Sequence, residues 1–271
     1  GDFGHNCVGH LKFGRSGRLK IRCWKTVGHG SLSLTSAIQR SCNPYFMQLS
    51  TELGNERMAN AFDMLNLGRA TGVKLPAEDR GIIPGSEWWR RELHPGESMT
   101  PARMAMLAIG QDESEATPLQ LAALTACIAN GGKYYRPRII KMVVDPKEGI
   151  LISDIPELRV DLVTEGMDSA QFADLRQGMW KAANELGGTA RRASPEDVEI
   201  GAKTGTAQTT DFGEKSHNAW TVAFGPFEEP RYAVAVMVQN GKSGGKVCGP
   251  LVNLIFRGLF AAEKGLSLIH I

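Results

Sequence analysis

The chain has 271 residues, of which 42% are hydrophobic and 22% are charged. This composition is ordinary for a globular protein with a sizeable core, and it excludes a disordered tail, a collagen-like repeat and a coiled coil. Lysine and arginine number 31 against 29 acidic residues, so the net charge of +2 gives no basic field that would favour nucleic acid as a partner.

The first part of the chain divides into a polar segment and a mainly helical lobe. Residues 1–31 are rich in glycine, histidine and cysteine and show no helical periodicity, so we expect a loop-rich Cys/His knuckle there. The helical lobe is expected over residues 32–132. It opens with Leu34, Ala37 and Ile38, which share one face of a predicted helix.

A break in the helical pattern follows at Asn43-Pro44. The residue before a proline is pushed out of the α region, whereas proline itself suits the first turn of a helix. We therefore expect a second helix that has Asn43 as its N-cap and ends at Gly54. Ser41 and Asn43 would then lie on a short turn between two helices, where side chains can point into a cleft.

The remaining helices and strands are predicted from hydrophobic periodicity and from the glycine and proline residues at their ends. Val234, Val236 and Val238 alternate with apolar neighbours, so that strand should be covered on both faces. We expect an α+β fold with an antiparallel sheet packed between helices, forming one N-terminally incomplete domain over residues 1–266 and followed by a non-native tail at 267–271. The expected helices are 56–67, 119–129 and 168–186, the expected long loop is 69–100, and the expected strands are 138–144, 199–209, 219–224 and 232–239.

One predicted strand carries the string Lys203-Thr204-Gly205-Thr206. On an edge strand, Gly205 would remove the side chain that blocks a ligand backbone, while Lys203 supplies a cation and Thr204 and Thr206 supply hydroxyls for a carboxylate. Taken singly, this string and Ser41-Cys42-Asn43 are common by chance. The plain alternatives are helix capping for Ser41 and Asn43 and a solvated strand residue for Lys203.

Read in order, S-x-N and then K-T-G, the sequence resembles the penicillin-binding transpeptidases, which are defined by S-x-x-K, S-x-N and K-T-G. The resemblance covers nearly the whole chain to about Lys264 and points to the elongation-specific class B enzymes, the penicillin-binding protein 2 group. Further matches are Cys23-Trp24, Gly28-His29-Gly30, Gly110-Gln111, Thr117-Pro118-Leu119-Gln120, Gly187-Gly188-Thr189-Ala190 and His217-Asn218-Ala219-Trp220.

The resemblance implies a role for each motif residue. The family is a serine-type peptidoglycan D,D-transpeptidase and β-lactam target that crosslinks stem peptides ending in D-Ala-D-Ala during cell elongation. Ser41 would relay a proton between the motif lysine and the leaving amine, and Asn43 would hold the substrate amide. Lys203 would orient Ser41, and the segment Thr204, Gly205 and Thr206 would bind the substrate carboxylate.

The resemblance also implies a cellular setting. It places the domain at the periplasmic face of the bacterial inner membrane, with a single N-terminal anchor outside this chain. The implied partners are a membrane glycosyltransferase and a rod-shape scaffold, with no nucleic acid and no organic cofactor. A β-lactam-sensing receptor domain and a β-lactamase-like hydrolase of the same fold are the alternatives.

The nucleophile of the family is missing from the expected place. No S-x-x-K string precedes Ser41, and the literal match Ser243-Gly244-Gly245-Lys246 follows K-T-G in what we predict to be a Gly-rich loop. The nucleophile needs a helix start, which places the lysine one turn along the same face. We therefore expect the chain to begin after the nucleophile and, by itself, to form no acyl-enzyme.

Cysteines and a histidine crowd the N-terminal part as Cys7, Cys23, His29 and Cys42. Three thiolates and one imidazole are a complete tetrahedral set for structural Zn²⁺, but the spacing is not that of a zinc finger. The spacing leaves open a Cys7–Cys23 disulfide with Cys42 as a buried thiol, or a His29 that only caps a turn. The resemblance favours zinc, because some penicillin-binding protein 2 members bind it at the corresponding positions. His5 and His10 are not expected to be ligands.

Overall fold

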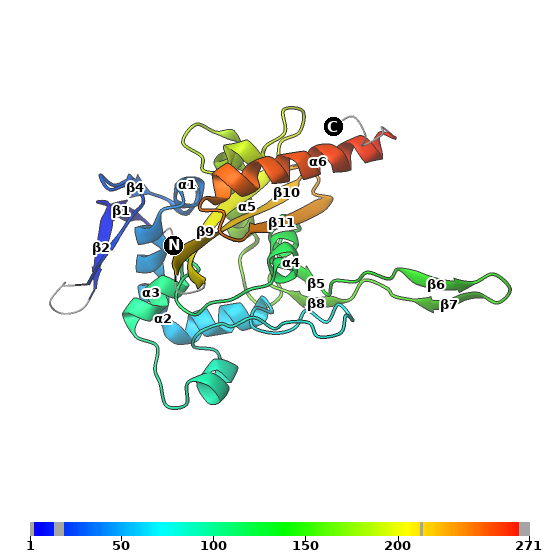
Figure 1. Cartoon of the computed structure of the whole chain (residues 1–271), viewed down its shortest axis with the longest axis horizontal. Coiled ribbons are helices and arrows are strands. Elements are labelled where there is room, and N and C mark those ends of the chain that lie inside the picture. Colours follow the sequence, from blue (N-terminus) through cyan, green and yellow to red (C-terminus); the bar gives the residue numbers. More distant parts are fainter. Residues whose placement is uncertain (1–2, 14–18, 212–213, 266–271) are drawn as a thin grey trace.

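The computed structural model describes residues 3–13, 19–211 and 214–265. A three-stranded antiparallel sheet in the order β11-β10-β9 lies between helices (Figure 1), with β9 at Gly201–Asp211, β10 at Glu214–Gly225 and β11 at Tyr232–Val238. The predicted α+β class is therefore confirmed. β10 begins five residues before its predicted start at 219 and pairs with β9 from Glu214 to Phe224.

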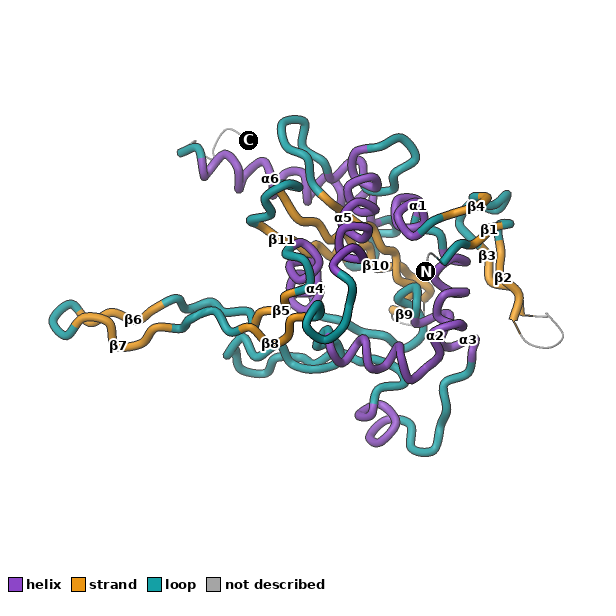
Figure 2. Tube along the Cα trace, turned by 180° about the vertical axis from the view of Figure 1, so that it is seen from behind, coloured by secondary structure: helices purple, strands orange, loops and turns teal. Residues whose placement is uncertain are grey.

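Helices cover both faces of the sheet (Figure 2). On one face, α6 (Gly249–Glu263) buries Val252 and Phe256 against Ala223 of β10. On the other face, Met179 of α5 (Ser169–Asn184) packs with Phe224 of β10 and with α4 (Pro118–Ala129). These two cores hold β9 and β10 in place between the helices.

The prediction for the last strand was only partly right. Val234 and Val236 of β11 pack toward α6, and the strand also contacts α4, so helices lie on both sides as expected. None of its residues is fully buried, however, and Met237 is exposed. The reason is topological, because β11 lies at one edge of the sheet in the part of the chain that the structure describes.

The helical lobe contains α1 (Leu34–Arg40), α2 (Asn43–Met64) and α3 (Pro101–Leu107). The sequence predicts that the second helix ends at Gly54, and Gly54 does interrupt α2, with φ 77°. The N-cap prediction was wrong by one residue, because Cys42 is the N-cap of α2 and Asn43 is its first residue. The helix α3 was not predicted, since it has only seven residues and lacks a full amphipathic repeat.

The knuckle is more regular than predicted. It contains β1 (His5–Cys7) paired with β4 (Gly30–Leu32), and β2 (His10–Phe13) paired with β3 (Leu19–Arg22). Strands of three or four residues show too little alternation to be recognised in a sequence.

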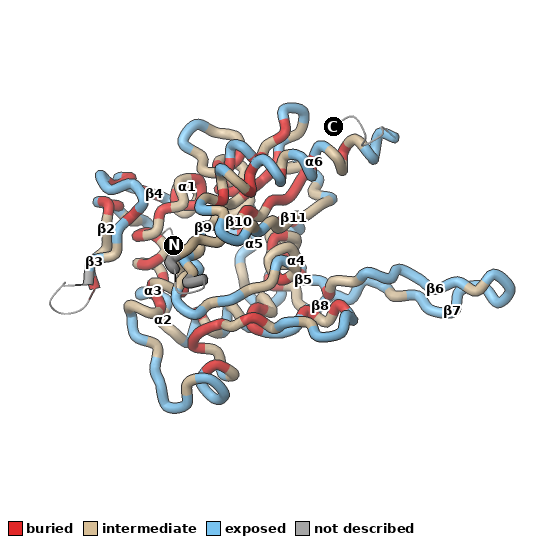
Figure 3. Tube along the Cα trace, viewed as in Figure 1, coloured by how far each residue is buried: buried red, intermediate tan, exposed pale blue. Residues whose placement is uncertain are grey.

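Beyond α4 the chain forms two small antiparallel pairs. β5 (Lys133–Tyr135) pairs with β8 (Leu158–Asp161), and β6 (Met142–Asp145) pairs with β7 (Gly149–Ser153). The strand predicted over 138–144 is therefore wrong in its first half. The pair β6–β7 extends away from the body and is exposed along most of its length (Figure 3).

The predicted loop over 69–100 is confirmed apart from a helical turn at Trp89–Leu93 and a single β-bridge between Ile82 and Glu115. Across the described ranges, we find no helix with the length and apolar character needed to cross a membrane. The predicted tail at 267–271 lies outside the described residues.

Candidate active site and thiol cluster

The turn between α1 and α2 holds Ser41 in an unusual backbone conformation. Ser41 is the C-cap of α1 and has φ 50° and ψ 54°, in the left-handed region that costs a residue with a side chain about 1–2 kcal/mol. The indole Nε1 of Trp24 donates to the carbonyl oxygens of Arg40 (2.9 Å) and Ser41 (3.1 Å). Trp24 thus satisfies carbonyls that the helix end leaves unpaired, which helps to hold the turn.

Lys203 reaches this turn from β9. Its Nζ donates to Ser41 Oγ at 2.7 Å and to the carbonyl oxygen of Thr204 at 2.5 Å. Burial disfavours the charged ammonium and lowers the pKa of Lys203 to about 8. Lys203 is half-buried and bonded to Ser41, so it is not a fully solvated strand residue. Ser41 does cap α1, as the alternative held, but through its backbone N–H, while its side chain bonds to Lys203.

The Ser41 turn and β9 face each other across a groove of about 1110 Å³. Its lining includes the predicted residues Ser41, Asn43 and Lys203–Thr206. Arg191, Arg192 and Lys246 also line it, whereas no Asp or Glu does among the described residues. A concave surface with cations and no carboxylate attracts an anionic ligand such as a peptide carboxylate.

The remaining K-T-G residues have defined surroundings. Thr204 Oγ1 lies 3.1 Å from Thr189 Oγ1, and Thr206 Oγ1 accepts from the backbone N–H of Gly244 at 3.4 Å. A Cβ atom at Gly205 would meet only Trp220 Cβ, at 3.4 Å, within contact distance. The side of the strand toward which a side chain at Gly205 would point is therefore open, whereas Gly244 packs closely against the backbone of Gly205.

The literal S-x-x-K string behaves differently from its prediction. Ser243 lies at the end of the loop after β11, as predicted, but the residues that follow it form a helical turn at Gly244–Cys248 that leads directly into α6. Ser243 and Lys246 both line the groove. No hydrogen bond joins their side chains within the described part of the chain, so Lys246 is not placed as a base for Ser243.

Cys7, Cys23, His29 and Cys42 converge in the core of the knuckle. Their ligand atoms all lie within 4.8 Å of one another, and all four side chains are buried. Ligands at Zn–S distances of ~2.3 Å around a tetrahedral centre lie ~3.8 Å apart, so this set fits a zinc ion with little movement. His5 and His10 are not members of the set.

The pKa shifts of Cys23 and His29 favour the deprotonated forms, which are the forms that bind a metal cation. The hydrogen bond from Cys42 lowers the pKa of Cys23 to about 5 and raises that of Cys42. Burial lowers the pKa of His29, which favours the neutral imidazole that binds metals. His29 Nδ1 lies 3.5 Å from Cys23 Sγ, while Nε2 is buried with no hydrogen-bond partner in the described ranges. All five cysteines are free thiols.

Comparison with known families decides the relationship. Residues 8–257 match the family model for the penicillin-binding protein transpeptidase domain. The chain belongs to this family. Stage V sporulation protein D of Bacillus subtilis is 33% identical over 245 residues, which are 88% of this chain and 35% of that protein. The peptidoglycan D,D-transpeptidase MrdA of Haemophilus influenzae is 28% identical over 255 residues, 87% of this chain and 37% of that protein.

Solved structures agree with this relationship. Penicillin-binding protein 2 of Pseudomonas aeruginosa, in complex with WCK 5153, matches with a TM-score of 0.81 and 30% identity over 97% of this chain and 55% of that chain. Penicillin-binding protein 2 of Helicobacter pylori, in complex with MreC, matches with a TM-score of 0.79 and 29% identity over 97% of this chain and 45% of that chain. The resemblance to the penicillin-binding protein 2 group is confirmed. The chain spans about a third of the length of the curated relatives described above.

The sequence did not single out every residue that shapes the groove. Trp24 and Thr189 stood within matched motifs, but nothing local shows that an indole would reach the carbonyls of Arg40 and Ser41 or that Thr189 would meet Thr204. Both contacts join segments that are distant in the sequence. Only the fold brings them together.

Proposed function

We propose that this chain is part of the transpeptidase domain of a penicillin-binding protein 2-type enzyme, which crosslinks peptidoglycan stem peptides through a serine acyl-enzyme during cell elongation. The contact between Lys203 Nζ and Ser41 Oγ, 2.7 Å long and inside a cationic groove, carries the proposal. A stem peptide that ends in D-Ala-D-Ala presents a carboxylate, and a β-lactam presents the same charge.

Each groove residue has a proposed part in that chemistry. Lys203, with its lowered pKa, holds Ser41 Oγ in one orientation, so that Ser41 can pass a proton to the leaving amine. Asn43 holds the substrate amide, and Thr204 and Thr206 bind the terminal carboxylate. The nucleophilic serine would come from residues outside these 271, because no S-x-x-K string precedes Ser41.

A structural zinc ion is proposed for the thiol cluster. Cys7, Cys23, His29 and Cys42 would hold it, and its chemistry would be to cross-link the knuckle to the start of α2. Since Cys42 lies between Ser41 and Asn43, the cross-link would fix the turn that carries both. Metal analysis tests this: we expect about one equivalent of zinc, and a Cys42→Ser variant that retains a full equivalent would refute the ligand set.

The setting of the whole protein is part of the proposal. The Helicobacter pylori relative was solved with MreC, which supports a rod-shape scaffold as a partner here too. A membrane glycosyltransferase is the second proposed partner. The proposed location is the periplasmic face of the inner membrane, with one anchor outside this chain.

Fluorescent penicillin labelling tests the assignment. The 271-residue chain and the longer protein that contains it would be compared, together with release of D-Ala from a stem pentapeptide. We expect label and D-Ala release only from the longer protein, with Lys203→Ala lowering the acylation rate by roughly 10²–10⁴. Ser243→Ala is the matched control and should keep full labelling.

The same assay separates the alternatives. Labelling of the 271-residue chain that disappears in Ser243→Ala would make Ser243 the nucleophile and overturn our assignment of the motifs. A longer protein that is acylated but releases no D-Ala would be a β-lactam sensor. One that turns penicillin over would be a hydrolase.

A further inference from the structure

The loop that joins α3 to α4 lies against the outer edge of β9. The Nε2 of Gln111 donates to the carbonyl oxygen of Thr206 at 3.1 Å, and its Oε1 accepts from the backbone N–H of Gln208 at 3.2 Å. Thr206 and Gln208 are two residues apart, so on this edge strand both backbone groups point away from β10. The carboxamide of Gln111 therefore occupies two backbone groups that an added strand would use, in the pattern that one residue of a parallel strand would make.

Two cavities meet at this contact. The cationic groove of about 1110 Å³ is lined by Lys203–Thr206 and by Gln111. A second cavity of about 880 Å³ continues along β9 from Gly205 to Thr209 and is lined on its other side by residues 112–116 of the loop. The two cavities share Gly205 and Thr206 of β9, and Gln111, which lines the first cavity, bonds to the strand at Thr206 and Gln208 beside this shared stretch.

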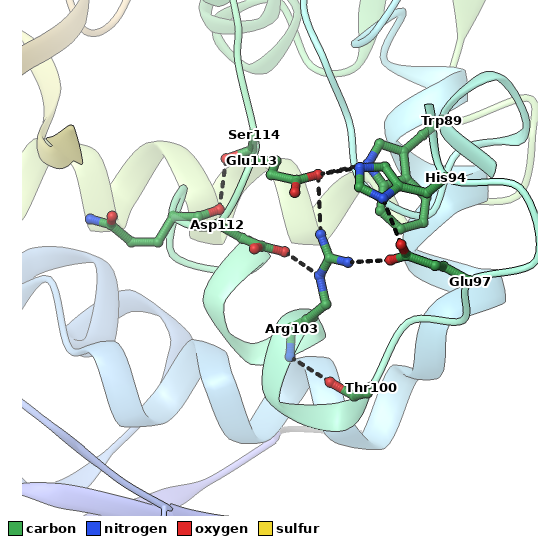
Figure 4. Close-up of polar contacts among 9 residues, drawn as sticks. Trp89, His94, Glu97, Thr100, Arg103, Asp112, Glu113 and Ser114 are labelled. Atoms are coloured by element: carbon green, nitrogen blue, oxygen red, sulfur yellow. Dashed lines mark hydrogen bonds and ion pairs between the residues drawn. The ribbon is translucent and has the colours of Figure 1, made fainter. Parts of the chain in front are cut away.

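The residues that follow Gln111 are tied to α3 (Figure 4). Arg103 donates from Nε to Asp112 at 2.9 Å and from a terminal nitrogen to Glu113 at 3.2 Å. Asp112 has φ 68°, a left-handed conformation that is uncommon for a residue with a side chain. The ion pair with Arg103 helps to keep Asp112 in this conformation and so keeps Gln111 turned toward β9.

A buried aromatic residue anchors the tie. Glu113 also accepts from Trp89 Nε1 at 3.1 Å and pairs with His94 Nε2 at 2.9 Å. Trp89 is fully buried, its ring stacks on His94, and the guanidinium carbon of Arg103 lies 4.8 Å from its centre. These contacts fix the Arg103 cluster (Trp89, His94, Arg103, Asp112 and Glu113) to the protein body. The loop is therefore held by a buried aromatic ring as well as by ion pairs.

We propose that Gln111 is a latch, which occupies the edge of β9 in place of an extended peptide and must leave before a peptide can add to the strand. Its release would free the carbonyl oxygen of Thr206 and the N–H of Gln208 on this edge. An extended peptide would then bind by strand addition, through backbone hydrogen bonds. That the peptide is a stem peptide rests on the proposed function, whereas the latch contacts themselves do not.

The test measures the latch and the ligand separately. Hydrogen exchange of the Gln208 amide, followed by NMR in the 271-residue chain, reports the latch without any ligand. The affinity for diacetyl-Lys-D-Ala-D-Ala reports strand addition. The variants are Gln111→Ala and Arg103→Gln, and the control is Gln171→Ala, which removes an exposed glutamine from α5.

In Gln111→Ala we expect the Gln208 amide to exchange roughly tenfold faster and the tripeptide to bind roughly tenfold tighter, because no latch state competes. Arg103→Gln should shift both readouts in the same direction by less. The control should change neither. Unchanged Gln208 exchange in Gln111→Ala would overturn the latch, and so would equal or weaker tripeptide binding, which would make Gln111 a ligand contact. Failure of every protein to bind the tripeptide, with the exchange change present, would instead overturn the proposed substrate.

Discussion

Lys203 should lower the stability of the fold that holds it. A lysine whose pKa falls from 10.5 to about 8 when the chain folds costs ~3 kcal/mol of folding free energy at neutral pH. The side chain is only partly buried in the open groove, so solvent reduces this cost. Lys203→Met keeps the length and removes the charge, and we expect it to raise the free energy of unfolding by ~1–2 kcal/mol at pH 7.

The pH dependence gives the sign of the effect. Because the folded pKa is the lower one, the unfolded state binds more protons between about pH 8 and pH 10.5, and the wild-type protein gains stability from this residue as pH rises through that window. Below pH 8 the cost is constant. The advantage of Lys203→Met should therefore be complete at pH 7 and should shrink toward pH 10.5.

Urea denaturation at a series of pH values measures this directly. The wild-type protein, Lys203→Met and the control Lys12→Met, which changes an exposed lysine of β2, would be compared from pH 7 to pH 10.5. The control should follow the wild type. The reasoning is refuted if Lys203→Met is less stable at pH 7, or if its difference from the wild type does not change over this range.

Other predictions concern how the groove is held. Gly178→Ala places a Cβ 2.8 Å from Ile38 Cβ at the contact of α5 with α1. We expect the free energy of unfolding, measured by urea denaturation, to fall by ~1–2 kcal/mol, because overpacking outweighs the gain in helix propensity. Equal or greater stability would contradict this. Trp24→Phe keeps the ring and removes the N–H that holds the Ser41 turn, so unfolding should need ~0.5–1.5 kcal/mol less while the zinc content stays the same; an unchanged free energy of unfolding would contradict it. The hydrogen bond to Glu97 raises the pKa of His94. The stabilising contribution of His94 is therefore complete below about pH 6.5 and is lost as pH rises through the folded pKa. Thermal melting should show this loss above pH 6.5, and His94→Gln should remove it; a variant with the wild-type pH profile would count against the ion pairs of His94.

Much of the site could be predicted because its signals are local. Proline at position 44 and glycine at position 54 determine where α2 begins and where it breaks, whatever the rest of the chain does. The K-T-G strand was predicted over 199–209 and is observed at Gly201–Asp211. The meeting of Ser41 with Lys203 was expected only because the resemblance to the transpeptidases supplied a contact across 162 residues.

The parts that could not be predicted depend on contacts between distant segments. Gln111 and Gln208 are 97 residues apart, and neither residue has a local feature that suggests a hydrogen bond to a strand edge. The short strands of the knuckle form because residues 5–7 meet residues 30–32, while each segment alone is too short to show a period. Cys42 rather than Asn43 is the N-cap of α2, although asparagine has the higher intrinsic preference, and Cys42 makes no side-chain cap hydrogen bond.

Contacts from separate parts of the molecule converge on the Ser41 turn. Trp24 binds its carbonyls, Cys42 joins it to the buried thiols, and Lys203 binds the hydroxyl of Ser41 from the sheet. A left-handed serine is costly, so a single exposed hydrogen bond of ~1 kcal/mol would not hold it in one conformation. The knuckle supplies two of these holds through Trp24 and the cluster. The knuckle therefore helps to hold the Ser41 turn in the position where Ser41 Oγ meets Lys203 Nζ at 2.7 Å, while β9 holds the lysine.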